Sequence, residues 1–192
     1  MTQFVLLVIG AIFVNNVVFT KFLGICPYLG VSKKIDTAIG MAMAVTFVLT
    51  LAGAITYIIQ NFILVPVNIT YLQTIVFILV IAALVQFVEI VMKKVAPALY
   101  KALGIYLPLI TTNCAILGVA ILSVQSNFNF ILTVVFSFAS AVGFGVALIL
   151  FAGIREALDT REVPKVFMGS PIALIIAGIL AMAFMGFSGM VK

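Results

Sequence analysis

Residues 23–31 read LGICPYLGV, with Cys26 near their centre, and part of this stretch occurs a second time around Cys114. Each cysteine is followed after two residues by Leu-Gly-Val, so the pattern C-x-x-L-G-V recurs at an offset of 88 residues, from position 26 to position 114. The sequence contains only these two cysteines, and both lie in apolar segments. A chain that repeats its only thiols in matching contexts is expected to use them as a pair.

A second pair of segments indicates an internal duplication. Residues 46–54 read TFVLTLAGA and residues 133–141 read TVVFSFASA, an offset of 87 residues from position 46 to position 133. Two matches in the same order and at nearly equal offset favour a true repeat. We expect one polytopic membrane domain over residues 1–192, with repeat one at about 1–96 and repeat two at about 97–192.

The composition excludes a soluble domain. Hydrophobic residues make up 66% of the chain and charged residues 8%, whereas soluble domains carry about 25% charged residues. A helix needs about 20 apolar residues to span a bilayer, and barrel strands would alternate apolar and polar residues over about 10 positions. The sequence therefore predicts an all-α integral membrane protein with six spans. The apolar runs lie at roughly 4–31, 36–60, 71–92, 98–122, 128–154 and 169–190.

Basic residues alternate between the connections of these runs. Connections one, three and five contain lysine or arginine, whereas connections two and four contain neither. Because basic loops stay in the cytoplasm, we expect both termini on the outer side of a bacterial or archaeal cell membrane. The net charge of +5 is thus assigned to topology, and no nucleic-acid partner is expected. The basic residues assigned to these three connections are Lys33, Lys34, Lys93, Lys94, Lys101, Arg155, Arg161 and Lys165.

Three spans in each repeat mean that the two repeats enter the membrane from opposite sides. Such inverted repeats place functional groups near the midplane on broken helices. The first run has 28 residues, about 42 Å as a straight helix, which favours a break near Gly24 and Pro27. The fourth run carries its disrupting residues around Cys114, at Gly104, Pro108 and Gly118. We therefore expect two inverted three-helix repeats with broken first and fourth helices.

The residues that could do chemistry are few. The chain has no histidine, and its carboxylates lie in connections or near the ends of spans, so no complete active site is expected in this chain alone. Glu89 is the deepest of them, and we assign it to the membrane interface. A zinc site or an iron–sulfur cluster takes four ligands, so Cys26 and Cys114 could hold one only with a second chain. The alternatives are inert buried cysteines or a disulfide between them. The carboxylates are Asp36, Glu89, Glu156, Asp159 and Glu162.

Polar residues inside the apolar runs leave two interpretations open. Lys21 is the one cation within a predicted span, and such a charge either has a function or extends to the surface along its apolar stem. Five further residues either line an ion path or form hydrogen bonds between helices. These residues are Asn15, Asn16, Thr111, Thr112 and Asn113.

Three segments carry a resemblance to a known family. They are VNNVVFTKFLGICPYLGVSKK at 14–34, LGIYLPLITTNCAILGVA at 103–120 and FMGFSGMVK at 184–192. They resemble the A-subunit family of the Rnf complexes, which are bacterial and archaeal ion-translocating ferredoxin:NAD oxidoreductases. The resemblance covers nearly the whole chain. The cysteine motifs are shared in looser form by the E subunits of Rnf complexes and by the D and E subunits of the sodium-pumping NADH:quinone reductase.

The resemblance implies a role for both thiols. Cys26 and Cys114 would each ligate a [2Fe-2S] cluster near the membrane midplane, with two further thiolates from a homologous E-type subunit. Electrons would cross the membrane through this cluster and drive Na⁺ or H⁺ outward. The implied partners also include membrane lipid and the B, C, D and G types of Rnf subunit.

Two other functions remain open from the sequence alone. One is a redox-inert inverted-repeat ion transporter module, in which Lys21 and the polar residues named above form the path. The other is a purely structural scaffold. Iron and acid-labile sulfide in the purified complex would separate the redox function from both.

Overall fold

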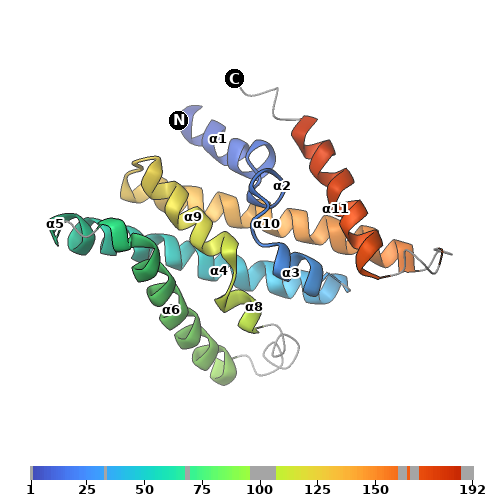
Figure 1. Cartoon of the computed structure of the whole chain (residues 1–192), viewed down its shortest axis with the longest axis horizontal. Helices are drawn as coiled ribbons and strands as arrows, with labels where there is room; N and C mark the ends of the chain where they lie inside the picture. The colour runs from blue at the N-terminus through green and yellow to red at the C-terminus, as the bar shows by residue number, and fades with distance from the viewer. Residues whose placement is uncertain are drawn as a thin grey trace.

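The helical segments carry the expected membrane character. The computed structural model describes residues 2–32, 34–67, 70–95, 107–159, 164 and 169–186, and all secondary structure among them is helical (Figure 1). The helix Ser170–Met185 is apolar but shorter than the four membrane-length segments named at the end of this paragraph. The predicted all-α, multi-pass membrane class is thereby confirmed. Helical segments long and apolar enough to cross a membrane are Ile35–Val67, Gln73–Val91, Pro108–Gln125 and Phe130–Leu158.

The first apolar run is broken, as predicted. It comprises α1 (Thr2–Ile9), the π-helix η1 (Gly10–Val14), α2 (Val17–Lys21) and α3 (Ile25–Gly30). The chain leaves the helical path at 15–16 and again at 22–24.

The second of these interruptions depends on left-handed backbone. Phe22 has φ 54° and Gly24 has φ 81°, a conformation that costs glycine little because it has no Cβ. Pro27, however, does not interrupt the helix. It lies in the first turn of α3, where its missing N–H has no partner to lose.

The fourth apolar run is also broken. Among its described residues, α8 (Leu107–Thr111) and α9 (Cys114–Gln125) are separated at 112–113. Pro108 lies in the first turn of α8 and Gly118 lies inside α9, so neither makes the break. The expectation was correct for the span but wrong for these two residues.

Two long antiparallel helices form the centre of the molecule (Figure 1). They are α4 (Ile35–Ile59), which continues through the π-helix η2 (Gln60–Leu64) into α5 (Val65–Val67), and α10 (Phe130–Asp159). The rings of Tyr57 and Phe130 lie 5.5 Å apart between centroids. The remaining helices are the 3₁₀ turn η3 (Thr70–Leu72), α6 (Gln73–Val95) and α11 (Ser170–Met185).

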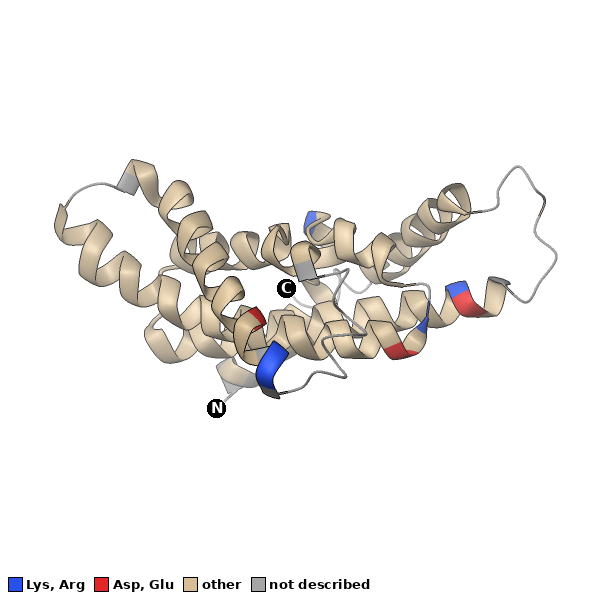
Figure 2. Ribbon diagram, turned by 90° about the horizontal axis from the view of Figure 1, so that it is seen from below, with Lys and Arg blue, Asp and Glu red and all other residues tan. Residues whose placement is uncertain are grey.

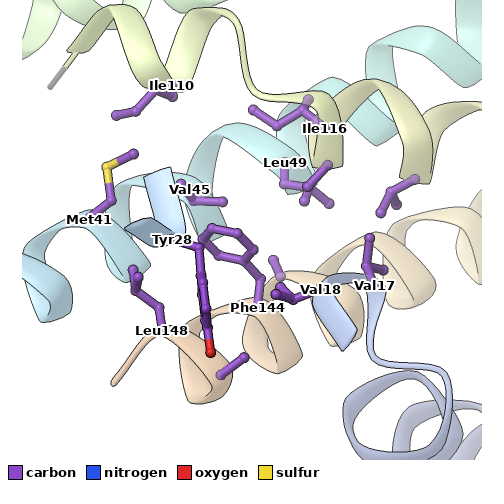
Figure 3. Close-up of a cluster of buried hydrophobic side chains, with 14 of the residues drawn as sticks. Val17, Val18, Tyr28, Met41, Val45, Leu49, Ile110, Ile116, Phe144 and Leu148 are labelled. Carbon is purple, nitrogen blue, oxygen red and sulfur yellow. The ribbon is translucent and has the colours of Figure 1, made fainter. Parts of the chain in front are cut away.

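The broken segments pack onto this central pair. Figure 3 shows Tyr28 of α3 among side chains of α4 and α10, with Ile110 and Ile116 of the fourth run on the other side of α4. The Tyr28 ring stacks on Phe151 of α10 at 4.2 Å between centroids. The core thus fixes α3, which begins at the residue before Cys26.

A stripe of small residues lets η1 approach α10. Ala139, Gly143 and Ala147 are four residues apart, a spacing that favours close helix packing in membranes, and all three are buried. A Cβ built on Gly143 would lie 3.1 Å from the Cα atom of Ile12. The neighbour of this stripe is therefore within the same chain.

Connections one and five meet at one end of the molecule. Arg155 donates to the Leu29 carbonyl at 2.9 Å and to the Ser32 hydroxyl at 3.0 Å. The Glu156 carboxylate accepts the N–H of Ile35 at 3.3 Å. Figure 2 shows charged residues of α4 and α10 gathered at this end. Two of the three connections expected on the cytoplasmic side, connections one and five, thus lie together.

Other charged residues are separate from this end. Lys93 forms a salt bridge with Glu89, one turn earlier on α6, at 3.1 Å, which agrees with an interfacial position for Glu89. Some residues named from the sequence lie outside the described residues. They are Lys33, Lys101, Gly104, Arg161, Glu162 and Lys165.

Candidate functional site

Both cysteines stand at the start of a helix that follows a break. Cys26 is the second residue of α3 and Cys114 is the first residue of α9. Both side chains are exposed, and both thiols are free. The cysteines are therefore neither buried nor joined by a disulfide in this structure.

The structure brings the second thiol to the loop that carries the first. The backbone N–H of Gly24 donates to the Cys114 Sγ at 2.9 Å, and Gly24 lies two residues before Cys26. A Cβ built on Gly24 would lie 2.6 Å from the Phe144 ring and 3.2 Å from the Ala115 Cβ. Glycine thus provides both the left-handed backbone and the space for this contact.

The two breaks cross each other. Helix α2 contacts α9, and α3 contacts α8, as Figure 1 shows for α3 and α8. A Cβ on Gly118 would collide with the Leu23 side chain, and one on Gly30 would lie 3.2 Å from Leu109. Each half of one broken run therefore packs on the opposite half of the other.

In each broken run an asparagine caps one helix, at the 15–16 interruption of the first run and at the 112–113 break of the fourth. The Asn16 carboxamide oxygen accepts the N–H of Val18, and the Asn113 carboxamide oxygen accepts the N–H of Ala115, each at 3.0 Å. The Asn16 amide also donates to the Gly143 carbonyl of α10 at 2.8 Å. Asn16 therefore forms a hydrogen bond between helices, which is one of the two roles that the sequence left open for it.

Asn113 differs from Asn16 in one respect. Its side chain is only 3% exposed, and its NH₂ group has no hydrogen-bond partner in the described part of the chain. Asn113 directly precedes Cys114 in the sequence.

Lys21 lies at the end of α2 and is exposed. Its side chain lines a cavity of about 370 Å³ between the first run and helices α9 and α10. Asn15 and Ser126 are the other polar residues of that lining, which includes no acidic side chain among the described residues. The Lys21 side chain thus lies at this cavity, and the cavity alone does not identify a ligand for it.

The donor set fits half of an iron–sulfur site. Among the described residues, no group of three or more His, Cys, Asp and Glu side chains could hold a metal ion. Four thiolates hold such a cluster, and this chain offers two, with the Cys114 sulfur held against the loop that leads to Cys26. The other two ligands would have to come from another chain.

Comparison with known proteins places this architecture in a family. The model of the family described as "Rnf-Nqr subunit, membrane protein" matches residues 4–191. The chain belongs to the Rnf-Nqr family.

Individual members are similar over their whole length. The A subunit of the Na⁺-translocating ferredoxin:NAD⁺ oxidoreductase complex of Acetobacterium woodii is 60% identical over 97% of both chains. The A subunits of the ion-translocating oxidoreductase complexes of Pseudoalteromonas translucida and Serratia proteamaculans are 56% and 57% identical over 100% of both chains. The resemblance to A subunits seen in the sequence is confirmed, and these names agree with a translocase subunit.

Sequence reasoning missed how this Rnf-Nqr chain makes its breaks. The signal was present, because asparagine is a preferred N-cap residue and precedes α2 and α9 directly. In an apolar segment the same residue also suits an interhelical hydrogen bond, and the sequence could not separate the two roles. The contact between Gly24 and Cys114 has no local sequence signal.

Proposed function

We propose that this chain is an electron-transfer subunit of an ion-translocating ferredoxin:NAD oxidoreductase complex. It donates Cys26 and Cys114 as two of the four thiolate ligands of a [2Fe-2S] cluster, and a homologous E-type subunit donates the other two. The observation that carries the proposal is the pair of free, exposed thiols at crossing helix breaks, linked by the hydrogen bond from Gly24 to Cys114.

The exposure of the thiols supports a shared site. A cluster held by one chain would need four ligands within that chain, whereas here both sulfurs are open toward whatever covers this surface. When bound, the cluster supplies one-electron transfer. The chain's own contribution is to fix the ligands and to direct the Gly24 N–H at one sulfur, since hydrogen bonds to sulfur tune the reduction potential.

The arrangement of the spans supports transport across the membrane. We assign six spans in two inverted repeats, with both termini on the outer side. The reciprocal packing of the broken runs supports the inversion. Electron flow through the cluster then drives Na⁺ or H⁺ outward, in a complex that includes B-, C-, D- and G-type subunits.

A redox-inert transporter module is the second candidate. The cavity that contains Lys21 favours it, because a charged side chain within an apolar segment marks many transport paths. This function would need neither thiol. The two candidates therefore differ in what cysteine substitution does.

The test uses the purified complex with Cys26→Ala or Cys114→Ala in this subunit. Iron, acid-labile sulfide, the electron paramagnetic resonance signal of the cluster and ferredoxin:NAD activity are measured. We expect each variant to lose the signal of this cluster and the electron transfer. Thr112→Ser is the matched control, because Thr112 is exposed beside the site and donates to its own helix, to the Pro108 carbonyl.

Two outcomes would contradict the proposal. Retention of the cluster signal and of activity in both cysteine variants would exclude the thiols as ligands. Loss of ion transport in Lys21→Ala alone, with both cysteine variants active, would favour the redox-inert transporter.

A further inference from the structure

Three buried hydroxyl groups on α10 have no partner among the described residues. Thr133, Ser137 and Ser140 are each at most 1% exposed, and none of their hydroxyl oxygens has a hydrogen-bond partner in that part of the chain. Spacings of four and three residues place them on one face of α10. Buried hydroxyls are normally hydrogen-bonded, so three unpartnered hydroxyls on one helix face require a polar partner outside the described residues.

The facing surface of α4 leaves room for these groups. A Cβ built on Gly53 would collide with the Ser137 side chain, so glycine is required opposite that hydroxyl. Two turns further along, Gln60 is 8% exposed, and its side-chain oxygen has no partner among the described residues. The interface between α4 and α10 thus contains a row of neutral oxygens, which we call the α4–α10 polar row: Gln60, Thr133, Ser137 and Ser140.

One end of the polar row opens into a cavity. The cavity measures about 250 Å³ and lies where connections two and four meet. Gln60 is part of its lining and begins the π-helix η2; π-turns are frequent at functional sites. Its polar lining residues carry no acidic or basic group in the described part of the chain and are Tyr57, Gln60, Asn61, Ser123, Asn127 and Asn129.

The other end of the polar row reaches the first helix break. Gly143 lies one turn after Ser140 on α10, and its carbonyl accepts the Asn16 amide at 2.8 Å. Asn16 caps α2, the helix that leads to the Cys26 loop. The row therefore links the cavity at one end of the molecule with the broken run that carries the first thiol.

The hydroxyls at the corresponding positions of repeat one lie in a different environment. At the offset of 87 residues, Thr133 and Ser137 correspond to Thr46 and Thr50 on α4. Both threonines are only partly buried and donate to carbonyls one turn earlier, each at 2.7 Å. Of the two sets, the copies on α10 are the ones buried without a partner among the described residues.

We propose that the α4–α10 polar row binds Na⁺ and conducts it between the 250 Å³ cavity and the first helix break. Gln60 Oε1 and the three hydroxyls replace water around the ion. Neutral oxygens suit this task, because a conduction site must bind an ion strongly enough to admit it and weakly enough to release it. The proposal rests on the proposed ion translocation and names its route through this chain.

The test uses the whole complex in liposomes, with ²²Na⁺ uptake measured during electron transfer from ferredoxin to NAD. Ser137→Ala and Thr133→Val remove hydroxyls with little change in volume. We expect each to raise the Na⁺ concentration for half-maximal activity about fivefold and to lower the Na⁺ transported per electron. Thr46→Val is the matched control and should change neither quantity, since its hydroxyl lies outside the row.

The cluster signal separates this proposal from the proposed function. We expect Ser137→Ala and Thr133→Val to keep the signal, whereas failure of the proposed function would appear as cluster retention in the cysteine variants. Unchanged Na⁺ dependence and unchanged uptake in both hydroxyl variants would overturn the route. Uptake of protons alone by the unmodified complex would overturn Na⁺ as its ligand. If Ser137→Ala prevents assembly of the complex, Gln60→Leu at the cavity end takes its place, and the Na⁺ dependence of activity and the Na⁺ uptake decide between the outcomes.

Discussion

The interruption at 15–16 in the first run and the break at 112–113 in the fourth run have the same local structure and differ in their tertiary contacts. At each of them, here called the first and second breaks, an asparagine side-chain oxygen caps the following helix, at Asn16 and at Asn113. The NH₂ group of Asn16 donates to the carbonyls of Ile12 and Gly143. The NH₂ group of Asn113 is buried and has no partner among the described residues.

This difference assigns separate tasks to the two breaks. The first break is fastened to α10 through the Asn16 amide, so it holds the broken run against the central helices. The second break has a buried NH₂ donor, in the residue before Cys114, that no described residue uses. Under the proposed function this donor is a candidate for tuning the cluster, since hydrogen-bond donors near sulfur change its reduction potential.

The largest effect is expected where the two broken runs touch. In Gly24→Ala, a side chain would enter the left-handed region, at a cost of about 1–2 kcal/mol, and would press on Phe144, at a further cost of about 1–3 kcal/mol. The contact from the Gly24 N–H to Cys114 would be lost with it. We expect a complex with lower thermal stability and little cluster signal.

Gly153→Ala is the control for this substitution. Gly153 lies inside α10 with no atom within 4 Å of an added Cβ among the described residues, so alanine there should leave stability unchanged or raise it by up to about 1 kcal/mol. A Gly24→Ala complex as stable and as well loaded with cluster as this control would contradict the assigned role of Gly24.

A smaller effect separates the two asparagines. Asn16→Ala removes a helix cap, worth about 0.5–2 kcal/mol, and also removes the buried hydrogen bond to the Gly143 carbonyl, worth about 0.5–1.5 kcal/mol. Asn113→Ala removes only the cap. Thermal unfolding of the complex should therefore show a larger loss for Asn16→Ala. Equal losses would mean that the bond to α10 contributes nothing.

The smallest effect on stability is expected for Asn113→Ser. Serine keeps an oxygen that caps α9 and lacks the NH₂ donor, so stability should change by less than about 1 kcal/mol. Under the proposed function we expect a lower reduction potential for the cluster, because loss of a donor one residue before a ligating cysteine disfavours the more negative, reduced form. Redox titration followed by electron paramagnetic resonance measures this shift. A potential equal to that of the unmodified complex would refute the role of the donor.

Sequence reasoning recovered the features that depend on composition and local pattern. The all-α membrane class and the breaks in both runs were predictable. Gly24 was correctly named as a breaking residue, because glycine adopts left-handed backbone without steric cost. These features require only the residue types along the chain.

The features that depend on packing were not predictable. Pro27 and Pro108 were expected to disrupt helices, but the first turn of a helix tolerates proline. Gly118 was grouped with them, whereas it stays helical and leaves space for Leu23. The unpartnered hydroxyl of Ser137 likewise becomes visible only when α4 and α10 are placed together.

The hydrogen bond from Gly24 to Cys114 has a consequence for how the site fills. It joins the backbone that leads to one sulfur with the other sulfur itself. Under the proposed function, folding therefore positions one sulfur against the backbone that leads to the other before a cluster binds. Loading of the cluster would then depend chiefly on the arrival of the subunit that supplies the other two ligands.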